Sequence, residues 1–318
     1  MSANYRRKIM VNVVTKRKSK AAIFFSKLKE YILQIPKEHS GFAKQTFMLA
    51  REDLLKTYKG AVIGPLWALV KPVFQLFVYW FAFSILRGQN NHTEMGVEYF
   101  LFIMAGFVPW FFMSDCIGRG SRTIADNRQF VNKVSFPVSV IMTYTTISKF
   151  YVHIFLLSLA YLYITVFGGI GVSIYNLQLL VLMPLMFLFF LALTWSLAPM
   201  SAFSKDFLNF ISTIMSGLFW LSAIGYDSYR IENPVIRNLL MCNPLAFFVN
   251  AYRKAIICKC WVWEAPTYPD SVAEKMLESG IHLHPLWETA IMLAELVLVI
   301  GLGIYNYNRL RKDLPDVL

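Results

Sequence analysis

Residues 177–203 read LQLLVLMPLMFLFFLALTWSLAPMSAF, an apolar run that contains no Asp, Glu, Lys or Arg. A helix needs about 20 such residues to cross roughly 30 Å of hydrocarbon, and this run exceeds that length. Helices and closed barrels are the only structures that satisfy every backbone N–H and C=O group in lipid. The stretch therefore predicts a membrane-spanning helix and makes the chain an integral membrane protein.

Five further apolar runs predict five further spans. They cover residues 61–86, 99–118, 138–167, 207–225 and 286–307. The composition agrees, because 57% of the 318 residues are hydrophobic and only 16% are charged, whereas soluble proteins have about half and about a quarter. The sequence thus predicts an all-α integral membrane protein with six transmembrane helices.

The basic residues set the expected orientation. In the first twenty residues the only candidate for a secretory signal is the apolar run Ile9–Val14, and six residues are too few for one. Residues 1–40 are therefore predicted to be a retained basic cytosolic tail. With that end inside, 22 Lys and Arg residues fall on the cytosolic side and 7 on the outer side, as the positive-inside rule requires. The formal net charge of +12 then reflects topology, so nucleic acid is not expected as a partner. Both termini are expected in the cytosol.

The segment before the first span, GFAKQTFMLAREDLLKTYKG at residues 41–60, has helical amphipathicity. Its apolar residues recur every three or four positions, at Ala43, Phe47, Ala50, Leu54 and Tyr58. Polar residues fall on the opposite side, at Gln45, Glu52, Lys56 and Lys59. This pattern predicts an N-terminal amphipathic interface helix lying along the inner membrane surface.

The segment Leu245–Trp263, LAFFVNAYRKAIICKCWVW, is long enough for a seventh span. Crossing would place Arg253, Lys254 and Lys259 in hydrocarbon, at about 2.5 to 3.5 kcal/mol each. It would also move the basic residues after the last span to the outer side. A re-entrant helical hairpin between spans five and six avoids both costs, and this is the predicted arrangement.

The sequence lacks the motifs of a catalytic or nucleotide-binding site. It contains no GxxxxGK[ST] phosphate loop, no HExxH and no cysteine pair at zinc-ligand spacing. The inner loops offer Asp126 and Asp206 singly rather than as a cluster that would hold Mg²⁺. No catalytic residue, metal or cofactor is therefore expected on this chain. Three outer cysteines, Cys242, Cys258 and Cys260, leave open whether one disulfide forms.

Several short stretches occur in an order that resembles a known transporter family. They are YKGAVIGPLWALVKP at residues 58–72, YWFAF at 79–83, AGFVPWFF at 105–112, NKVSFP at 132–137, SKD at 204–206 and NPL at 243–245. Together with the predicted topology, they resemble the membrane subunit of type-2 ABC exporters that move teichoic acids, O-antigens and capsules. The resemblance covers about residues 41–318, and the tail of residues 1–40 is a departure from the shorter permeases of this group.

The resemblance implies how such a chain works. It implies a homodimer joined to two separate ATP-binding-cassette subunits, which bind ATP and Mg²⁺. It also implies that the dimer carries an undecaprenyl-diphosphate-linked polysaccharide outward across the bacterial cytoplasmic membrane. Within the family, the resemblance is nearest to the wall teichoic acid exporters, with O-antigen exporters next.

Basic residues near the start of the first span are candidates for substrate access. Arg51, Lys56 and Lys59 are expected at headgroup depth, and Lys71 lies two to three turns further along. A lipid diphosphate approaching along the inner leaflet would meet these cations, and Gly60, Gly64 and Pro65 would let the chain turn from the interface into the span. The competing interpretations are contact with anionic lipid headgroups and snorkelling of Lys71. Lys149, with Asp115 as a candidate partner, has the same alternatives.

Aromatic residues near the ends of spans are candidates for lining a channel. They are Trp67, Tyr79, Trp80, Trp110, Phe111, Phe112, Phe219 and Trp220. Sugars stack their C–H faces on aromatic rings with little regard to sugar identity, so such rings would let a polymer slide. Most Trp and Tyr in these places form lipid-interface belts instead, and we expect about a third of the eight to face a channel.

Because the chain has no nucleotide-binding site, the free energy of ATP hydrolysis must reach it through contact with its ATPase partner. The longest inner loop between spans, residues 119–137, is the candidate lever, with a short helix that ends before Pro137. Asp126, Arg128, Phe130 and Lys133 are its candidate coupling residues. The alternative is a basic loop that merely follows the positive-inside rule.

Two other functions remain to be separated from polysaccharide export. The first is a drug or small-lipid exporter subunit of the same broad fold, which small amphiphiles should stimulate. The second is a membrane-bound glycosyl- or phosphoglycosyl-transferase, which should turn over alone with Mg²⁺. A permease should show no activity without its ATPase.

Overall fold

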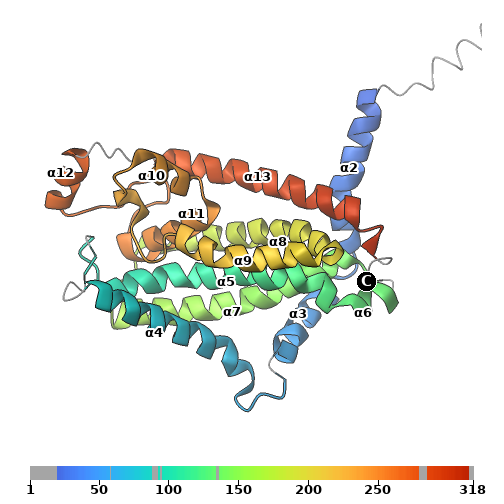
Figure 1. Ribbon diagram of the computed structural model, residues 1–318, viewed down its shortest axis with the longest axis horizontal. Coiled ribbons are helices and arrows are strands. Elements are labelled where there is room, and N and C mark those ends of the chain that lie inside the picture. Colours follow the sequence, from blue (N-terminus) through green and yellow to red (C-terminus); the bar gives the residue numbers. More distant parts are fainter. Residues whose placement is uncertain are drawn as a thin grey trace, which may run out of the picture.

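The structure is a computed structural model that describes residues 20–57, 59–87, 92–93, 95–133, 136–278 and 285–314. Within these ranges the chain is helical and forms no β-strand, with a single β-bridge between His92 and Glu98. Long helices lie side by side along the long axis of the molecule (Figure 1). The all-α fold expected from the sequence is therefore confirmed.

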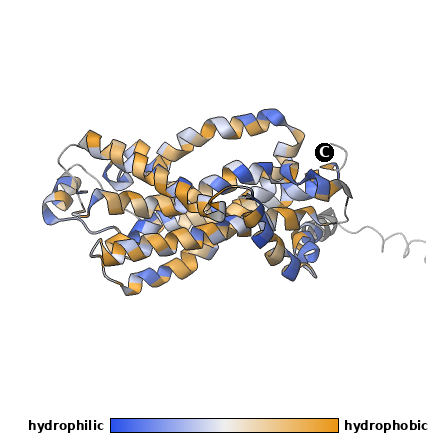
Figure 2. Ribbon diagram, turned by 90° about the horizontal axis from the view of Figure 1, so that it is seen from below, coloured by the Kyte–Doolittle hydropathy of each residue, from blue (hydrophilic) through white to orange (hydrophobic). Residues whose placement is uncertain are grey.

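Five helices form the body of the bundle. They are α4 (Trp67–Arg87), α5 (Tyr99–Asp126), α7 (Val138–Val166), α8 (Leu179–Phe203) and α13 (Pro285–Leu310). Each is long and apolar enough to cross a membrane, α8 together with the 3-10 turn η2 (Ile174–Gln178) before it. Figure 2 shows hydrophobic residues along the long helices. The chain is thus a multi-pass membrane protein.

Shorter helices complete the described chain. They are α2 (Lys20–His39), α3 (Ala43–Thr57), α6 (Arg128–Lys133), α9 (Lys205–Leu221), α10 (Pro234–Met241), α11 (Pro244–Arg253) and α12 (Asp270–Glu278). In Figure 1, α2, α3, α6 and the C-terminal end of α13 gather at one end of the bundle, whereas α10 and α12 lie at the other. We call these the inner and the outer end, following the orientation expected from the sequence.

Three of the predicted span boundaries differ from the observed helices. The run at 61–86 becomes helical only from Gly64, in the 3-10 turn η1 (Gly64–Leu66), because Gly60 and Gly64 adopt positive φ of 84° and 51° and turn the chain into α4. The second helix continues to Asp126 instead of ending at 118. The helix in the 207–225 run ends at Leu221, before Ala223 with its φ of 58°, and is 17 residues long.

Helix α5 is the centre of the fold. It packs against α7, α8 and α11, and most of its residues are buried, Phe102, Phe107 and Phe112 among them. Helix α4 is the opposite case, because about half of its described side chains are exposed and the others are half-buried. It contacts α5 through its C-terminal part and leaves the bundle towards its N-terminal end (Figure 1). Helix α3 partly closes the space between α4 and the rest of the bundle.

The segment proposed as a hairpin does not form one continuous helix. Helix α11 passes into a π-helical turn, η4 (Lys254–Cys258), and the helical run ends at Lys259 in the left-handed conformation. Arg253 and Lys254 are each 2% exposed and surrounded by protein. Two of the three cations that argued against a crossing are therefore buried inside the fold instead of facing lipid, whereas Lys259 is exposed.

Part of the expected N-terminal tail is helical. Residues 1–40 were expected to be a tail, and residues 1–19 lie outside the described ranges. Residues 20–39 form helix α2, which packs on α7 and α13. Ile35 is 4% exposed and belongs to a buried cluster that includes Met142 and Tyr307. The expectation of a tail rested on charge alone. It did not take account of the apolar face of α2, which packs on α7 and α13.

Candidate functional site

A cavity of about 490 Å³ lies between α3, the start of α4, the C-terminal half of α5 and the N-terminal half of α7. It exists because α4 and α5 separate towards the inner end while α3 approaches α7. On the α7 side, α3 is held by packing of Ala50 against Ile141 and Tyr144. The observed helix Ala43–Thr57 matches the amphipathic segment expected at 41–60, although Phe47 of the predicted apolar face is 58% exposed.

The cavity is lined by charges of both signs. Its cations are Lys56, Lys71, Arg119 and Lys149, and its carboxylates are Asp53, Asp115 and Asp126. One pair neutralises itself, because Arg119 donates to Asp115 through Nε at 3.0 Å and Nη2 at 2.8 Å. Three cations and two carboxylates then remain. The cavity thus suits an anionic group better than a cationic one.

The lysines enter the cavity from three helices. Lys56 is in the last turn of α3 and Lys71 in the second turn of α4, and both side chains are exposed. Lys149 on α7 is half-buried, and its Nζ donates to the carbonyl of Thr145 at 3.0 Å. One hydrogen bond leaves an ammonium with two further donors. Lys149 is thus positioned to bind an acceptor inside the cavity.

The structure brings some of the expected charges together and leaves others apart. Arg51 and Lys59 are exposed, and neither lines the cavity, so only Lys56 and Lys71 of the four access candidates meet there. Asp115 was considered as a partner for Lys149, but its carboxylate pairs with Arg119 one turn along α5. The i,i+4 spacing of Asp115 and Arg119 was visible in the sequence and could have revealed this pair.

The eight candidate aromatics separate into two groups. Trp67, Phe111 and Phe112 line the cavity. The others lie further along the bundle, where Tyr79 stacks on Phe219 at 4.6 Å between ring centroids and so joins α4 to α9. Trp110 and Trp220 contact the same Phe219 ring at 5.5 Å, and Trp80 packs on Phe100 at 5.6 Å. This second group is a packed cluster between α4, α5 and α9.

The candidate coupling residues lie at the inner end next to the cavity. Asp126 ends α5 and lines the cavity, and exposed Arg128 begins α6. Phe130 is half-buried and packs on the cluster of Ala50, Ile141 and Tyr144. Lys133 ends α6, but its side chain is outside what the structure describes. Helix α6 thus touches both α3 and α7, the two helices that form the base of the cavity.

A residue that sequence reasoning missed fixes the turn between α5 and α6. Asn127 is buried, and its Nδ2 donates to the carbonyl of Thr123 at 2.9 Å. Its Oδ1 accepts from the hydroxyl of Tyr144 on α7 at 3.1 Å. A second link is the edge-on contact of Phe42 and Phe136 at 5.3 Å, between the α2–α3 turn and the approach to α7. These contacts fix the chain on both sides of α6, at Asn127 against α7 and at Phe136 against the turn before α3.

A second polar cluster lies at the outer end. The hydroxyl of Tyr229 donates to Glu288 at 2.9 Å, and the hydroxyl of Tyr268 donates to Asp227 at 2.6 Å. Burial raises the pKa of the Asp227 carboxyl, whereas its hydrogen bond from Tyr268 lowers it. The cluster joins the loop after α9 to α13 and to the segment before α12. Cys242, Cys258 and Cys260 are free thiols, and the Cys258 sulfur lies 3.8 Å from that of Met95.

Comparison with known proteins adds independent information. Residues 44–257 match the family model described as ABC-2 type transporter. A relative from Myxococcus xanthus, named O-antigen export system permease protein RfbA, is 27% identical over 210 residues, which cover 64% of this chain and 77% of the relative. A protein of the same name from Klebsiella pneumoniae is 22% identical over 268 residues, which cover 83% of this chain and 92% of the relative. A second Klebsiella pneumoniae protein of that name is 23% identical over 211 residues, with 65% and 78% covered.

The matched family segment contains α3, the cavity, α6, α9 and α11. It is about two thirds of the chain, and the stretches that carried the resemblance fall within it. Chains of this family carry out transport, and a separate partner subunit hydrolyses ATP. The chain belongs to the ABC-2 type transporter family, as a membrane-embedded transport subunit and not an enzyme.

Proposed function

We propose that this chain is the permease subunit of an ATP-driven exporter that moves a lipid-linked polysaccharide of the O-antigen type outward across the bacterial cytoplasmic membrane. The names of all three relatives given above support O-antigen over teichoic acid as the polymer class. Undecaprenyl diphosphate is the proposed carrier lipid, and the cavity is its proposed access site.

The observation that carries this proposal is the surface of α4. Lys71 lies at the inner end of an exposed stripe that continues through Phe74, Val78, Phe81 and Ile85. Residues at these spacings share one face of a helix. A diphosphate lipid has a charged head and a long apolar tail. Its head fits the cavity at Lys71 and its tail fits the stripe, so one helix offers both surfaces that the molecule needs.

The cavity cations extend this fit. Lys56 and Lys149 lie across the cavity from the start of α4, so phosphate oxygens could accept from more than one helix. Charge-assisted hydrogen bonds of this kind contribute about 1.5 to 3 kcal/mol each. Trp67 at the mouth offers a ring face for the first sugars. Together these groups form a proposed binding site for the head of the lipid-linked polymer.

The proposed topology has six crossings, with both termini in the cytosol. Helix α9 is the sixth crossing, since 17 residues reach about 26 Å at 1.5 Å per residue. Five crossings would leave the two ends of the chain on opposite sides. The gathering of α2, α3 and the end of α13 at one end therefore favours an even number (Figure 1). In this arrangement α3 is an interface helix, and α10 with α11 forms a re-entrant hairpin from the outer side.

The proposed assembly is a homodimer with two ATP-binding-cassette subunits. Membership of the ABC-2 family supports an ATPase partner. Helix α6 is the proposed contact for that partner, since it is exposed at the inner end and packs on the helices that line the cavity. A second copy would cover exposed apolar surface on α4 and complete a passage for the polymer. ATP and Mg²⁺ would be bound by the partner chains.

The test compares cations that line the cavity with cations that do not. Lys71→Met, Lys56→Gln and Lys149→Met should each lower the apparent affinity for lipid-linked polysaccharide by about 10- to 100-fold, the equivalent of one charge-assisted hydrogen bond. Arg51→Gln and Lys59→Gln are matched controls on the same inner surface and should export normally. Export would be measured in proteoliposomes with the partner ATPase, at equal permease abundance.

Two outcomes would contradict the proposal. If the cavity variants export like the wild type, the head of the substrate binds elsewhere. If small amphiphiles stimulate the ATPase while lipid-linked polysaccharide does not, the chain is a drug or small-lipid exporter subunit.

A further inference from the structure

Sulfur-bearing side chains gather at the outer end of the bundle, the end at which α12 lies (Figure 1). The Sγ of Cys258 lies 3.8 Å from the Sδ of Met95, and the thiols of Cys258 and Cys260 are hydrogen-bonded to each other. Met276 of α12 packs beside Met95 and is 6% exposed. The loop before α5, the turn after α11 and helix α12 therefore each bring sulfur to one place.

A tight turn holds Met95 in position. The backbone N–H of Thr93 donates to the carbonyl of Val97 at 2.7 Å, and its hydroxyl donates to the same carbonyl at 3.0 Å. The N–H of Gly96 donates back to Thr93 at 2.9 Å, and the positive φ of 76° at Gly96 lets the chain reverse. Met95 is thus fixed in a closed turn and its sulfur is kept near Cys258.

A strained turn holds the two cysteines. Lys259, between them, has φ and ψ of 51°, the left-handed region that a residue with a Cβ rarely adopts. Gln178 maintains this turn, because its Nε2 donates to the carbonyl of Cys260 at 2.8 Å and its Oε1 accepts from the N–H of Val262 at 2.9 Å. Strained backbone of this kind persists where surrounding contacts impose it, and it is concentrated at ligand sites.

The hydrogens at these sulfurs are too few for the contacts they make. The Cys258 thiol has a single S–H, which can point to Met95 or to Cys260 but not to both. The hydrogen bond from Cys258 lowers the pKa of Cys260, burial raises it and the charge of Lys254 lowers it, with a net downward shift. The thiolate is the form that binds metal ions. A cation among the three sulfurs would satisfy all of them at once.

The set of side chains indicates which cation fits. In the part of the chain that the structure describes, no group of three His, Cys, Asp or Glu residues could hold a metal ion. A structural Zn²⁺ site would need four such ligands in a tetrahedron. Here a thioether takes the third place, and thiolate with thioether ligands favours Cu(I). Met95 and Cys258 are half-buried instead of sealed in the core, so an ion can reach them from solvent.

We propose that Cys258, Cys260 and Met95 form a binding site for one Cu(I) ion, with Met276 beside it. On binding, the ion replaces the proton of the Cys258 thiol, which is released to solvent, so both cysteines bind as thiolates and Met95 binds as a neutral thioether. The ion would join the loop before α5 to the turn after α11. The sequence predicted no metal because Met95 lies 163 residues before Cys258. The site does not depend on the proposed substrate.

The test titrates the purified full-length chain in detergent with Cu(I), under anaerobic reducing conditions and against a chromogenic Cu(I) chelator. The wild type should bind one ion per chain, and X-ray absorption should show sulfur ligands only. The double variant Cys258→Ser, Cys260→Ser should lose this ion. Met95→Leu, which keeps the side-chain volume, should bind it with lower affinity. Cys242→Ser removes an exposed thiol outside the site and is the control.

Thermal unfolding gives a second measurement on the same proteins. Cu(I) should raise the unfolding midpoint of the wild type and of Cys242→Ser, because a ligand that binds the folded state stabilises it. The midpoint of the double cysteine variant should not change. Met95→Leu keeps the test decisive even where the double variant does not fold.

Four results would overturn the inference. The first is a wild type that binds no Cu(I). The second is copper that remains after the double cysteine substitution or that has nitrogen or oxygen ligands. The third is wild-type affinity in Met95→Leu, which would remove the thioether from the site. The fourth is a disulfide between Cys258 and Cys260 that persists in the reductant, found by mass spectrometry, which would make the pair a structural crosslink.

Discussion

The guanidinium carbon of Arg253 lies 3.6 Å from the centroid of the Phe102 ring, so a cation at the end of α11 stacks on the first turn of α5. Its nitrogens also donate to the carbonyls of Phe102 at 3.2 Å and Ala223 at 2.8 Å, and to that of Ile224. These acceptors come from α5 and from the turn that ends α9. A charge that would be costly in hydrocarbon is thus satisfied by backbone oxygens and a ring face.

Gly106 makes room for this arginine. A Cβ at position 106 would lie 2.8 Å from Arg253 Nη2 and 3.2 Å from Val249. Gly106→Ala should therefore displace a hydrogen-bonded, buried guanidinium and destabilise the protein by about 1 to 3 kcal/mol. Gly118→Ala on the same helix meets nothing within 4 Å and is the control. Thermal unfolding of the two variants in detergent would compare them, and equal midpoints would mean that Arg253 needs no such space.

Helices α8 and α13 approach closely at Gly303. A Cβ there would lie 2.3 Å from the carbonyl oxygen of Ala192, so Gly303→Ala forces two backbones apart. Because close backbone contact at small residues stabilises helix pairs in membranes, the variant should unfold at a lower temperature and purify in lower yield. Gly301→Ala, one half-turn away and open, should behave as the wild type. Similar yields and midpoints for both would refute the packing argument.

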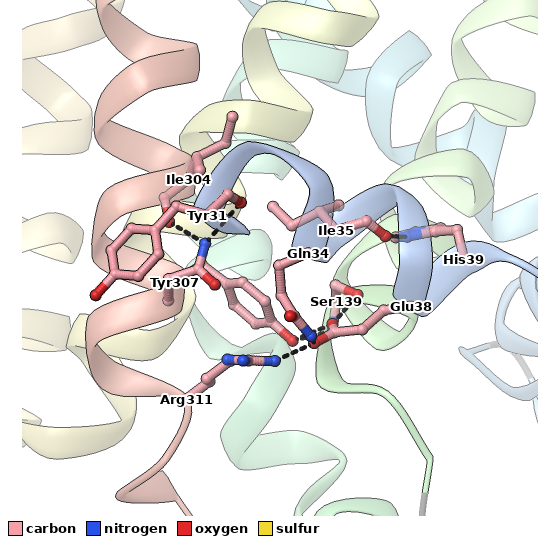
Figure 3. A network of polar contacts seen from close by, with 10 residues as sticks. Tyr31, Gln34, Ile35, Glu38, His39, Ser139, Ile304, Tyr307 and Arg311 are labelled. Atoms are coloured by element: carbon pink, nitrogen blue, oxygen red, sulfur yellow. Dashed lines mark hydrogen bonds and ion pairs between the residues drawn. The ribbon is translucent and has the colours of Figure 1, made fainter. Parts of the chain in front are cut away.

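Glu38 accepts four hydrogen bonds, which come from Gln34, Ser139, Tyr307 and Arg311 (Figure 3). Glu38→Ala should release α2 from α7 and α13 and cost about 1 to 3 kcal/mol, because Ser139 and Tyr307 lose their acceptor. Hydrogen exchange should then rise in residues 31–39 while the core of α5 stays protected. Glu38→Gln keeps part of the network and should give an intermediate rate. Unchanged exchange in both variants would show that Ile35 alone holds the helix.

Helix α6 is expected to transmit the work of ATP hydrolysis. Asp126→Ala with Arg128→Ala removes two exposed charges without touching the core, so the protein should insert and fold normally. We expect either loss of partner binding or ATPase activity that no longer drives export. Phe130→Ala should additionally loosen α6 from α3, since that ring packs at Ala50. Export at the wild-type rate by the triple variant would exclude this loop as the lever.

The assembly should be a dimer of this chain that acquires ATPase activity only with its partner. The physical reason is that the chain has no nucleotide-binding motif and one copy offers half of a passage. Native mass spectrometry of the purified complex should give two copies of each subunit. A stable monomer that exports with its ATPase would contradict the prediction.

The sequence by itself determined the helical membrane fold and the family. Crossing lipid requires a continuous apolar run, which is a local property, so the five long helices could be read from residues 61–86, 99–118, 138–167, 177–203 and 286–307. The amphipathic segment before the first span was visible for the same reason. The stretches that carried the family resemblance are also local, and the comparisons confirmed it.

Only the tertiary structure decided which of these local features meet. Lys56, Lys71 and Lys149 form one cavity because α4 separates from α5 and α3 packs on α7, whereas Arg51 and Lys59 on the same inner surface stay outside it. The AGFVPWFF stretch was recognisable, yet the role of its glycine depends on Arg253, far along the chain. Likewise, the sequence predicted a charged tail where the structure has helix α2. This helix is held to the bundle because Glu38 accepts hydrogen bonds from Ser139, Tyr307 and Arg311. Contacts between residues that are far apart in the sequence depend on how the helices pack, and a local sequence pattern does not contain that information.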